Sequence, residues 1–235
     1  MDFSDYVSDN DETFSKTLAA NIQAFMQKAY SITEIMSTNS DIISMDGAKQ
    51  KALLEQAAAK KDFFDLLYMM DTKGDQTARS KGSLGNRVSR WWFIQMMETK
   101  KPFVSKSYYS LSGNIAVNSI YFPVYNAYGQ LLGIMGSDIK LDAIQEMVDK
   151  FSTESRYAYV LDGEGAVVAH PDKTQVTEIY NYKTLKKTVL VKDESGNVKK
   201  MTRAIRLQRN KTDIHSRYLS FPRICICIWK RLQKI

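Results

Sequence analysis

Residues 115–139 read IAVNSIYFPVYNAYGQLLGIMGSDI, and this stretch indicates the fold more clearly than any other part of the chain. Its two halves, Ile115–Tyr125 and Gln130–Ile139, are rich in the β-branched and aromatic residues that favour strands. The turn-like connection Asn126–Gly129 between them predicts an antiparallel pair. Every second residue of the later strand should share one face of a sheet, namely Leu132, Ile134, Gly136 and Asp138.

The segments on either side extend this pattern outward. Phe63–Met70 is a strand-like run that ends in the turn Asp71–Gly74, and Gln76–Ser80 is its predicted hairpin partner. Arg90–Thr99 has a helical pattern. The remaining predicted elements nearby are a strand at Val104–Tyr109, a connection at Ser112–Asn114 and a helix at Leu141–Phe151.

Two helices are predicted in front of these strands. Apolar residues recur at steps of three and four across 12–37, which places them on one face of an α-helix. A second helix is predicted over Gly47–Lys61 with Asp46 as its N-cap. Candidate caps of the first helix are Asp9, Asn10 and Asp11. The order of elements predicts an α+β fold of PAS-like type, an antiparallel sheet with its helices packed against one face.

A second module begins near Arg156 and echoes the first hairpin. Tyr157–Leu161 and Ala166–Ala169 are predicted strands around the tight turn Asp162–Gly165, and Thr184–Val198 supplies a further strand or two. The pattern dissolves after about residue 200, so this module is predicted to be truncated. The predicted organisation is a long N-terminal helix in 1–46, a first PAS-like module in 47–155, an incomplete second module in 156–200 and an anomalous tail in 201–235.

The charge of the chain changes abruptly at the last of these boundaries. Nine of the 33 Lys and Arg and one of the 26 Asp and Glu fall in 201–235, which leaves 24 basic and 25 acidic residues in 1–200. Both cysteines, Cys225 and Cys227, lie in the same tail, and their spacing without a second ligand pair does not indicate a metal site. The absence of cysteine from 1–200 is compatible with an extracytoplasmic location.

No motif in the chain predicts an enzyme. No serine or cysteine stands in a nucleophile elbow, and the sequence has no glycine-rich phosphate loop or histidine cluster. We therefore expect no catalytic residue, cofactor or metal. His170 precedes Pro171 at the end of a predicted hairpin, which fits a structural hydrogen bond. No run approaches the roughly 18 apolar residues of a membrane span, and the acidic opening of the chain is not a signal peptide.

The candidate binding residues lie between Arg90 and Asp138. In Arg90–Phe93 a guanidinium, which can bind a carboxylate through two hydrogen bonds, stands beside two indoles that offer N–H donors and flat apolar walls. Asp138 needs a partner, which can be a helix, an arginine or a ligand cation. From the residues alone, an Arg90–Asp138 salt bridge or a helix cap stays open beside a ligand role, as does burial of Trp91 and Trp92 in the core.

The whole pattern resembles a double Cache domain, the extracytoplasmic sensor domain of bacterial transmembrane receptors. The resemblance covers about residues 12–195 and implies a distal pocket for a small molecule and a long first helix that rises from a membrane segment. This chain would then be the sensor part of a cell-membrane receptor, without its transmembrane segments. The segments that carry the resemblance are Phe63–Gly74, Asn86–Arg87, Arg90–Phe93, Pro102–Tyr108, Phe122–Tyr125, Leu132–Ile139 and, in the proximal half, Tyr157–Pro171.

Within that family, the amino-acid binders share a motif that this sequence matches at five positions. The resemblance implies that Arg90 and Trp92 hold the carboxylate of a ligand and that Asp138 takes its ammonium group. Phe93 stands where an aromatic residue is expected, and Tyr108 matches a tyrosine that contacts the ligand. A zwitterion needs a cationic fork at one end and an anion at the other, which agrees with these roles.

Two positions depart from the motif. A tyrosine is expected five residues before Arg90, where this chain has Gly85, and an acidic residue is expected two residues after Tyr108, where it has Ser110. Ser110 therefore occupies a ligand-binding position of the motif. The expected ammonium site then has one carboxylate instead of two. An α-amino acid is the first choice of ligand, and an amine or a simple carboxylate stays open.

The output and the partners of such a sensor also stay open. The resemblance implies a chemotaxis signalling module, with a histidine kinase or a diguanylate cyclase as alternatives, and a homodimer through the N-terminal helix. A hypothesis from another class assigns the basic tail to nucleic acid or an anionic membrane surface. The tail has no helical periodicity, so we expect no nucleic-acid partner. The residues that would carry this alternative are Arg203, Arg206, Arg209, Lys211, Arg217, Arg223 and Trp229.

Overall fold

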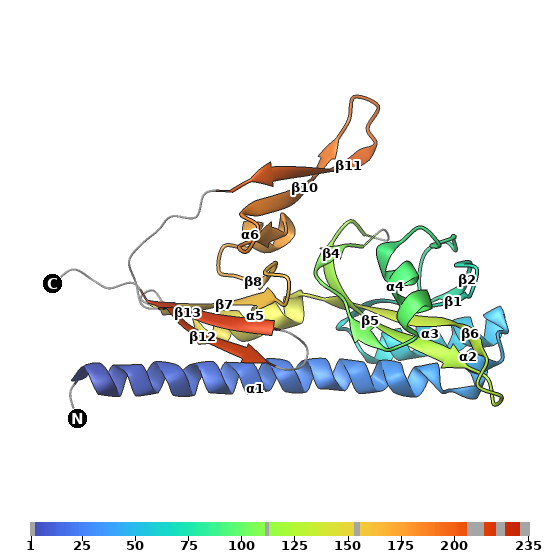
Figure 1. The fold of residues 1–235 in the computed structure, drawn as a ribbon, viewed down its shortest axis with the longest axis horizontal. Helices are drawn as coiled ribbons and strands as arrows, with labels where there is room; N and C mark the ends of the chain where they lie inside the picture. The colour runs from blue at the N-terminus through green and yellow to red at the C-terminus, as the bar shows by residue number, and fades with distance from the viewer. Residues whose placement is uncertain (1–2, 111–112, 153–155, 206–213, 220–223, 231–235) are drawn as a thin grey trace.

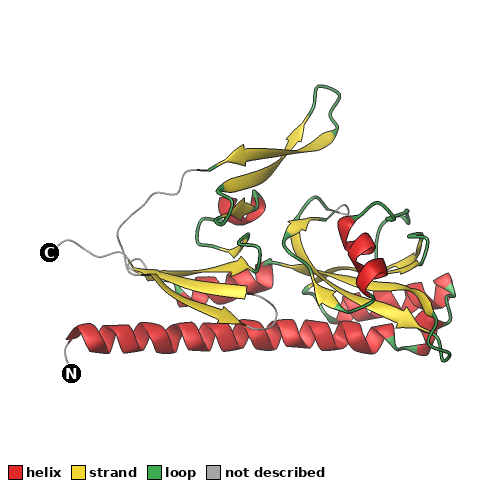
Figure 2. Ribbon diagram, in the orientation of Figure 1, coloured by secondary structure: helices red, strands yellow, loops and turns green. Residues whose placement is uncertain are grey.

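A single long helix, α1 (Phe3–Ser37), runs along one side of two α+β modules that follow each other along its axis (Figure 1). The first module contains α2 to β6, the second contains α5 to β13, and strands form the centre of each (Figure 2). Within the described residues, no helix combines the length and the apolar character that a membrane span requires. The computed structural model describes residues 3–110, 113–152, 156–205, 214–219 and 224–230.

Helix α1 begins earlier than its apolar stripe predicts. The stripe starts near residue 12, whereas the helix starts at Phe3. The capping role expected for Asp9, Asn10 or Asp11 is therefore wrong, because all three lie within the helix. An apolar stripe marks the part of a helix that packs, and backbone hydrogen bonding can continue beyond it. The buried residues of the stripe divide between two cores, with Leu18, Ile22 and Met26 in the second module and Ala29 and Met36 in the first.

Two shorter helices, α2 (Ser40–Ile43) and α3 (Gly47–Lys60), open the first module. Asp46 caps α3 as predicted, because its Oδ1 accepts hydrogen bonds from the backbone N–H groups of Ala48 at 2.9 Å and Lys49 at 3.2 Å. This cap fixes where α3 begins on the sheet that follows.

The sheet of the first module is antiparallel, with strand order β2-β1-β6-β5-β3 and with β4 paired to β5. The single strand expected over Val104–Tyr109 is interrupted after two residues. Ser105 Oγ accepts the N–H of Ser119 at 2.8 Å, so a side chain takes the place of a backbone acceptor in the ladder. The elements are β1 (Phe64–Asp71), β2 (Gln76–Arg79), α4 (Trp91–Thr99), β3 (Phe103–Val104), β4 (Tyr108–Tyr109), β5 (Ala116–Tyr125) and β6 (Leu131–Lys140).

Helices cover both faces of this sheet, which corrects the expectation of helices on one face. Leu54 of α3 lies in one buried cluster with Leu67 and Met69 of β1. Trp92 of α4 lies in another, with Tyr68 of the same strand. Successive side chains of a strand point to opposite faces, and β1 is buried along almost its whole length. The apolar run of β1 reflects burial on two sides.

A shift in the register between β5 and β6 places Leu132 on the other face of the sheet from the one predicted. Val124 of β5 lies opposite Gly133, whereas Tyr125 lies opposite Leu131, so Leu132 is the extra residue of a bulge. Leu132 packs against the cluster on the α3 side of the sheet, and so it does not continue the row that leads to Asp138.

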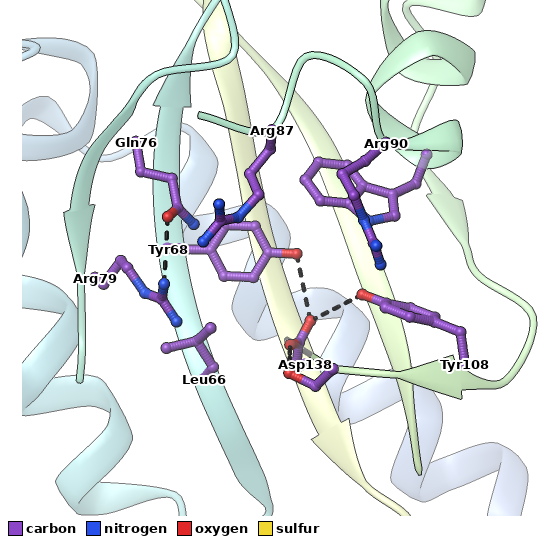
Figure 3. Close-up of a pocket in the computed structure, with 10 residues that line it drawn as sticks. Leu66, Tyr68, Gln76, Arg79, Arg87, Arg90, Tyr108 and Asp138 are labelled. Carbon is purple, nitrogen blue, oxygen red and sulfur yellow. Dashed lines mark hydrogen bonds between the residues drawn. The ribbon is translucent and has the colours of Figure 1, made fainter. Parts of the chain in front are cut away.

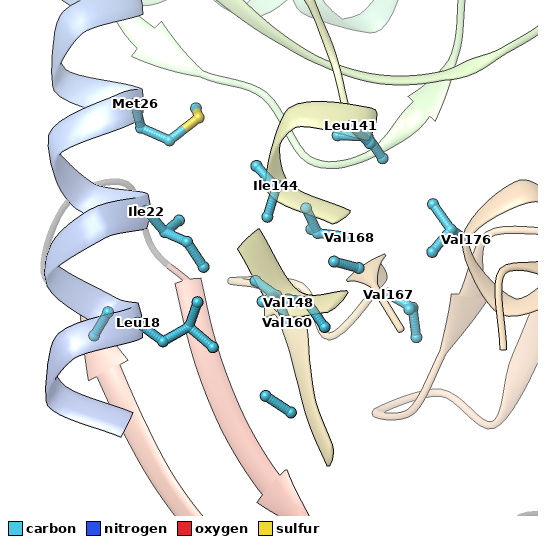
Figure 4. Packing of buried hydrophobic residues seen from close by; sticks show 13 residues of the cluster. Leu18, Ile22, Met26, Leu141, Ile144, Val148, Val160, Val167, Val168 and Val176 are labelled. Atoms are coloured by element: carbon cyan, nitrogen blue, oxygen red, sulfur yellow. The ribbon is translucent and has the colours of Figure 1, made fainter. Parts of the chain in front are cut away.

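The second module has two sheets, ordered β12-β13-β7-β8 and β11-β10-β9. Its main core forms where α5 and the first of these sheets meet α1, and Figure 4 shows Ile144, Val148 and Val160 packed toward Leu18 and Ile22. The elements are α5 (Asp142–Phe151), β7 (Arg156–Asp162), β8 (Val167–Ala169), α6 (Thr174–Thr177), β9 (Tyr180–Asn181), β10 (Lys186–Lys192), β11 (Val198–Ala204), β12 (Ile214–Leu219) and β13 (Ile224–Lys230).

The boundary expected at residue 200 is wrong, because β11 runs through it and pairs with β10 along its whole length. The chain after it does not form a separate tail either. Strand β13 pairs with β7 on one side and with β12 on the other, so residues expected to lie outside the second module complete its sheet. Backbone hydrogen bonds, which do not depend on charge balance, hold these strands together. Arg206, Arg209, Lys211 and Arg223, expected to bind nucleic acid in the rival hypothesis, lie outside the described residues.

Candidate functional site

A pocket opens on the face of the first module's sheet that carries α4 (Figure 3). It contains about 290 Å³ of empty space, part of which is open to solvent. Its polar lining comes from separate elements: Tyr68 of β1, Arg79 of β2, Arg87 of the following loop, Arg90 and Trp92 at the start of α4, and Asp138 of β6.

Asp138 lies deep in the pocket and is 3% exposed. Hydroxyl groups surround its carboxylate. Oδ1 accepts a hydrogen bond from Ser119 at 2.6 Å and lies 3.3 Å from the hydroxyl of Tyr68 and 3.4 Å from that of Tyr108. Oδ2 accepts a hydrogen bond from Ser110 at 3.1 Å. Burial raises the pKa of Asp138, while the hydrogen bonds from the hydroxyls act in the opposite direction.

Neither structural partner considered for Asp138 is present. Helix α5 has Leu141 at its N-cap position and no side-chain capping bond, so Asp138 does not cap it. Among the described residues no Lys or Arg forms a salt bridge with Asp138, and the Arg90 guanidinium lies 5.7 Å from the centre of the Tyr108 ring instead. A buried carboxylate that only hydroxyls surround can still neutralise a cation that enters the pocket.

Arg90 and Trp92 bring unused N–H donors to the same pocket. Trp92 is 3% exposed, and its ring stacks on Tyr121 with 4.8 Å between ring centres and 18° between planes. The Trp92 Nε1–H and the Arg90 Nε–H are both buried and have no hydrogen-bond acceptor among the residues that the structure describes. Buried donors are nearly always paired in folded proteins, because an unpaired one costs about 1–3 kcal/mol. These two donors are therefore suited to an acceptor on a bound ligand.

The structure brings five of the six predicted binding residues together. Arg90, Trp92, Tyr108, Ser110 and Asp138 all line the pocket. Phe93, the sixth, does not line it. Phe93 is 4% exposed and lies in the buried cluster under α4, because consecutive residues of a helix point in directions about 100° apart. Trp91, the other indole of the motif, stands outside the pocket and meets the ring of Tyr108 edge-on.

Sequence reasoning missed four further polar lining residues, Tyr68, Gln76, Arg79 and Arg87. One signal for the arginines was available. Residues 1–200 contain four arginines, and three of them, Arg79, Arg87 and Arg90, line this one pocket. Arginine is scarce in the rest of residues 1–200, so its concentration in this one segment indicates a functional role. Tyr68 gave no comparable signal, since an aromatic residue within an apolar strand is typical of a core.

The remaining candidates for chemistry have structural roles or lie elsewhere. His170 Nδ1 accepts a hydrogen bond from the backbone N–H of Asp172 at 2.9 Å, which is the turn role predicted for it. Burial lowers the pKa of His170 and so favours its neutral form. In the part of the chain that the structure describes, no three His, Cys, Asp or Glu residues gather closely enough to hold a metal ion.

Comparison with known families agrees with this architecture. The family model of the Cache domain matches residues 3–217. The methyl-accepting chemotaxis protein PscA of Pseudomonas syringae pv. tomato is 26% identical over 171 residues, which cover 68% of this chain and 26% of PscA. Sporulation kinase D of Bacillus subtilis is 28% identical over 127 residues, which cover 53% of this chain and 25% of the kinase. The chain spans about a quarter of the length of these curated relatives.

Solved structures show the same fold. The ligand-binding domain of the Pseudomonas fluorescens chemoreceptor CtaA, in complex with L-serine, has a TM-score of 0.72 at 18% identity and covers 99% of this chain and 100% of that one. The ligand-binding domain of the Pseudomonas aeruginosa amino acid chemoreceptor PctB, in complex with L-Arg, has a TM-score of 0.69 at 19% identity, over 96% and 95% of the two chains. The chain belongs to the Cache domain family, which confirms the resemblance seen in its sequence.

Proposed function

We propose that the pocket of the first module binds a small amino acid, and that the chain is the extracytoplasmic sensor module of a bacterial transmembrane chemoreceptor. One observation carries the proposal. Two buried N–H donors on Arg90 and Trp92, which have no acceptor within the described parts of the chain, line the same pocket as the buried carboxylate of Asp138. The donors suit a ligand carboxylate and Asp138 suits an ammonium group. No residue is assigned a catalytic role.

Comparison with relatives supports the physiological part of the proposal. The similar proteins include methyl-accepting chemotaxis proteins, and the solved neighbours include ligand-binding domains in complex with L-serine and with L-Arg. In such a receptor the pocket-bearing module would be the membrane-distal one, and α1 would rise from the membrane. The similarity to sporulation kinase D favours a sensor kinase as the second candidate output.

Calorimetric titration of the chain with L-amino acids, simple amines and simple carboxylates tests the binding proposal. We expect an amino acid to bind with micromolar affinity, on the order of −8 kcal/mol. Arg90→Ala should weaken that ligand by roughly 2–5 kcal/mol, because a buried carboxylate loses its charged partner. An Arg90→Ala variant that binds as tightly as the parent would assign Arg90 a purely structural role.

Asp138→Asn separates the ligand classes, since Asn is similar in shape to Asp and carries no charge. An amino acid or amine should lose a few kcal/mol of binding free energy, because its ammonium group is desolvated without a counter-ion. A simple carboxylate should bind equally well or more tightly, because a nearby like charge is removed. Circular dichroism of the variant checks that the fold is intact. Unchanged or tighter binding of the amino acid would overturn the assignment of the ammonium site.

A further inference from the structure

The charges that line the pocket are unequal. Three guanidinium groups, on Arg79, Arg87 and Arg90, converge on it from different elements (Figure 3), and Asp138 supplies the only carboxylate among the described residues that line it. The next carboxylate, Asp65, does not line the pocket and is already paired with Lys81 at 2.7 Å. A simple zwitterion uses one guanidinium and one carboxylate, so two positive charges remain beside it.

The position of Arg87 depends on an unusual residue nearby. Gly85 stands where amino-acid binders are expected to have a tyrosine. A Cβ atom at Gly85 would lie 2.7 Å from Arg87 Nη1, which is closer than such contacts allow. The glycine thus leaves the space that the Arg87 guanidinium occupies. In this chain the Arg87 guanidinium lies beside the position at which the family motif has a tyrosine.

The loop that carries Arg87 is held in place. The backbone N–H of Arg87 donates to the carbonyl oxygen of Gly74 at 2.7 Å, which ties the loop to the turn between β1 and β2. Asn86 adds side-chain hydrogen bonds to the carbonyl oxygen of Lys73 at 3.1 Å and to Asp75 Oδ1 at 2.8 Å. The Arg87 guanidinium is therefore presented from a fixed backbone, as a binding residue needs to be.

Arg79 completes the basic side of the pocket. It is 6% exposed, and its Nη1 donates to the carbonyl oxygen of Ser83 at 2.7 Å and to Gln76 Oε1 at 3.3 Å. Burial lowers the pKa of Arg79, and the positive charge of Arg87 lowers it further, against the attraction of Asp138 and Asp65. Two cations that repel each other at a partly desolvated wall are stabilised when an anion binds between them.

We infer that the preferred ligand is an acidic amino acid, whose side-chain carboxylate binds at a basic subsite formed by Arg79 and Arg87. This inference rests on the proposed function, in which Arg90 and Trp92 take the α-carboxylate and Asp138 takes the ammonium group. The subsite then determines which amino acid binds, because the amide of an asparagine or glutamine side chain carries no charge for the arginines.

Titration calorimetry with L-aspartate, L-asparagine, L-glutamate and L-glutamine tests the inference. We expect at least one acid to bind ten times or more tightly than its own amide. Arg87→Gln should reduce that ratio to about one, because the charge that distinguishes the acid from its amide is removed. Lys49→Gln removes an equal charge from α3, on the opposite side of the sheet, and should keep the ratio of the parent.

Gly85→Ala gives a second variant that keeps every charge. The added methyl group displaces the Arg87 guanidinium, so the preference for the acid should fall while binding of the amide persists. Equal affinity of the parent for each acid and its amide would overturn the inference and leave the proposed function standing. Binding of L-alanine without binding of aspartate, asparagine, glutamate or glutamine would also overturn the inference and leave the proposed function standing. A chain that binds no amino acid at all would overturn both proposals.

Discussion

The hydroxyl of Tyr109 in β4 lies 2.7 Å from the carbonyl oxygen of Thr188 in β10, and this contact joins the first module to the second. The carbonyl oxygen of Thr177 lies 2.5 Å from the same hydroxyl, so the two acceptors share one donor. Tyr108, the neighbour of Tyr109 in β4, lines the pocket. Successive residues of a strand point to opposite faces, so a strand of two residues carries both a pocket residue and an intermodule contact.

Tyr109→Phe removes this contact and leaves the ring in place. We expect it to lower the free energy of unfolding by about 1 kcal/mol, since two partly buried carbonyl oxygens lose a donor. Ligand affinity should stay unchanged in the same variant. Urea denaturation and calorimetry measure the two quantities. Tyr128→Phe is the matched control, because Tyr128 is 89% exposed and its loss of a hydroxyl should change neither. A stability equal to that of the parent would contradict the role of Tyr109 in joining the modules.

Trp92→Phe should separate binding from stability. The Trp92 Nε1–H has no acceptor among the described residues, so the removal of this unpaired donor should offset the cavity that the smaller ring leaves, and the free energy of unfolding should change little. The same substitution should weaken a ligand carboxylate by about 1.5–3 kcal/mol, the value of a hydrogen bond to a charged group. Trp91→Phe, at an indole outside the pocket, is the control and should leave affinity near that of the parent. Equal losses of affinity in the two variants would argue against a direct contact from Trp92.

Acidification should stabilise the ligand-free protein through Asp138. Its pKa is raised by burial, so the folded state binds the proton more readily than the unfolded chain does. The contribution of Asp138 to the free energy of unfolding therefore falls as the pH rises through the raised pKa. Asp138→Asn cannot ionise and should be more stable than the parent at about pH 7, with a difference that shrinks toward about pH 4. Urea denaturation across this range measures the trend, and a difference that grows on acidification would contradict it.

Deletion of residues 206–235 should destabilise the second module. It removes β13, whose residues 224–230 pair with 156–162 of β7, and so exposes an edge of the central strand. We expect a lower melting temperature, by about 2–4 °C for each kcal/mol lost in a chain of this size. Binding to the first module should persist. A deletion variant that melts at the same temperature would show that β12 and β13 contribute no stability.

The parts of the fold that local chemistry determines could be predicted from the sequence. Alternating apolar residues and turn residues placed β5 and β6, and a capping aspartate placed the start of α3 at Asp46. The bulge at Leu132 could not be predicted, because it depends on how β5 and β6 pair. The role of β13 was missed for a similar reason. Its partner β7 lies more than sixty residues earlier, and no local pattern reports such a pairing.

The residues of the candidate site likewise include some that the sequence could predict and some that it could not. The motif around Arg90 is contiguous and chemically unusual, so it could be found in the sequence. Arg79 and Arg87 reach the pocket only because β2 and the loop after it fold back beside β1. Phe93 was misplaced because a motif gives the spacing of residues but not the rotation of the helix that carries them. Placing these three side chains required the tertiary structure.

The floor of the pocket and helix α1 are held at one axial position by a pair of hydroxyls. Thr33 Oγ1 of α1 lies 2.6 Å from Ser137 Oγ of β6, both buried, and Ser137 is the neighbour of Asp138. Thr33 donates to the carbonyl oxygen of Ala29, so Ser137 is the donor to Thr33. A shift of α1 by one turn, about 5.4 Å, would leave both buried hydroxyls without this hydrogen bond. Helix α1 has 35 residues and is about 52 Å long, and an axial shift of it within the first module would break this contact. The helix and the strand that carries Asp138 therefore keep this contact only if they move together.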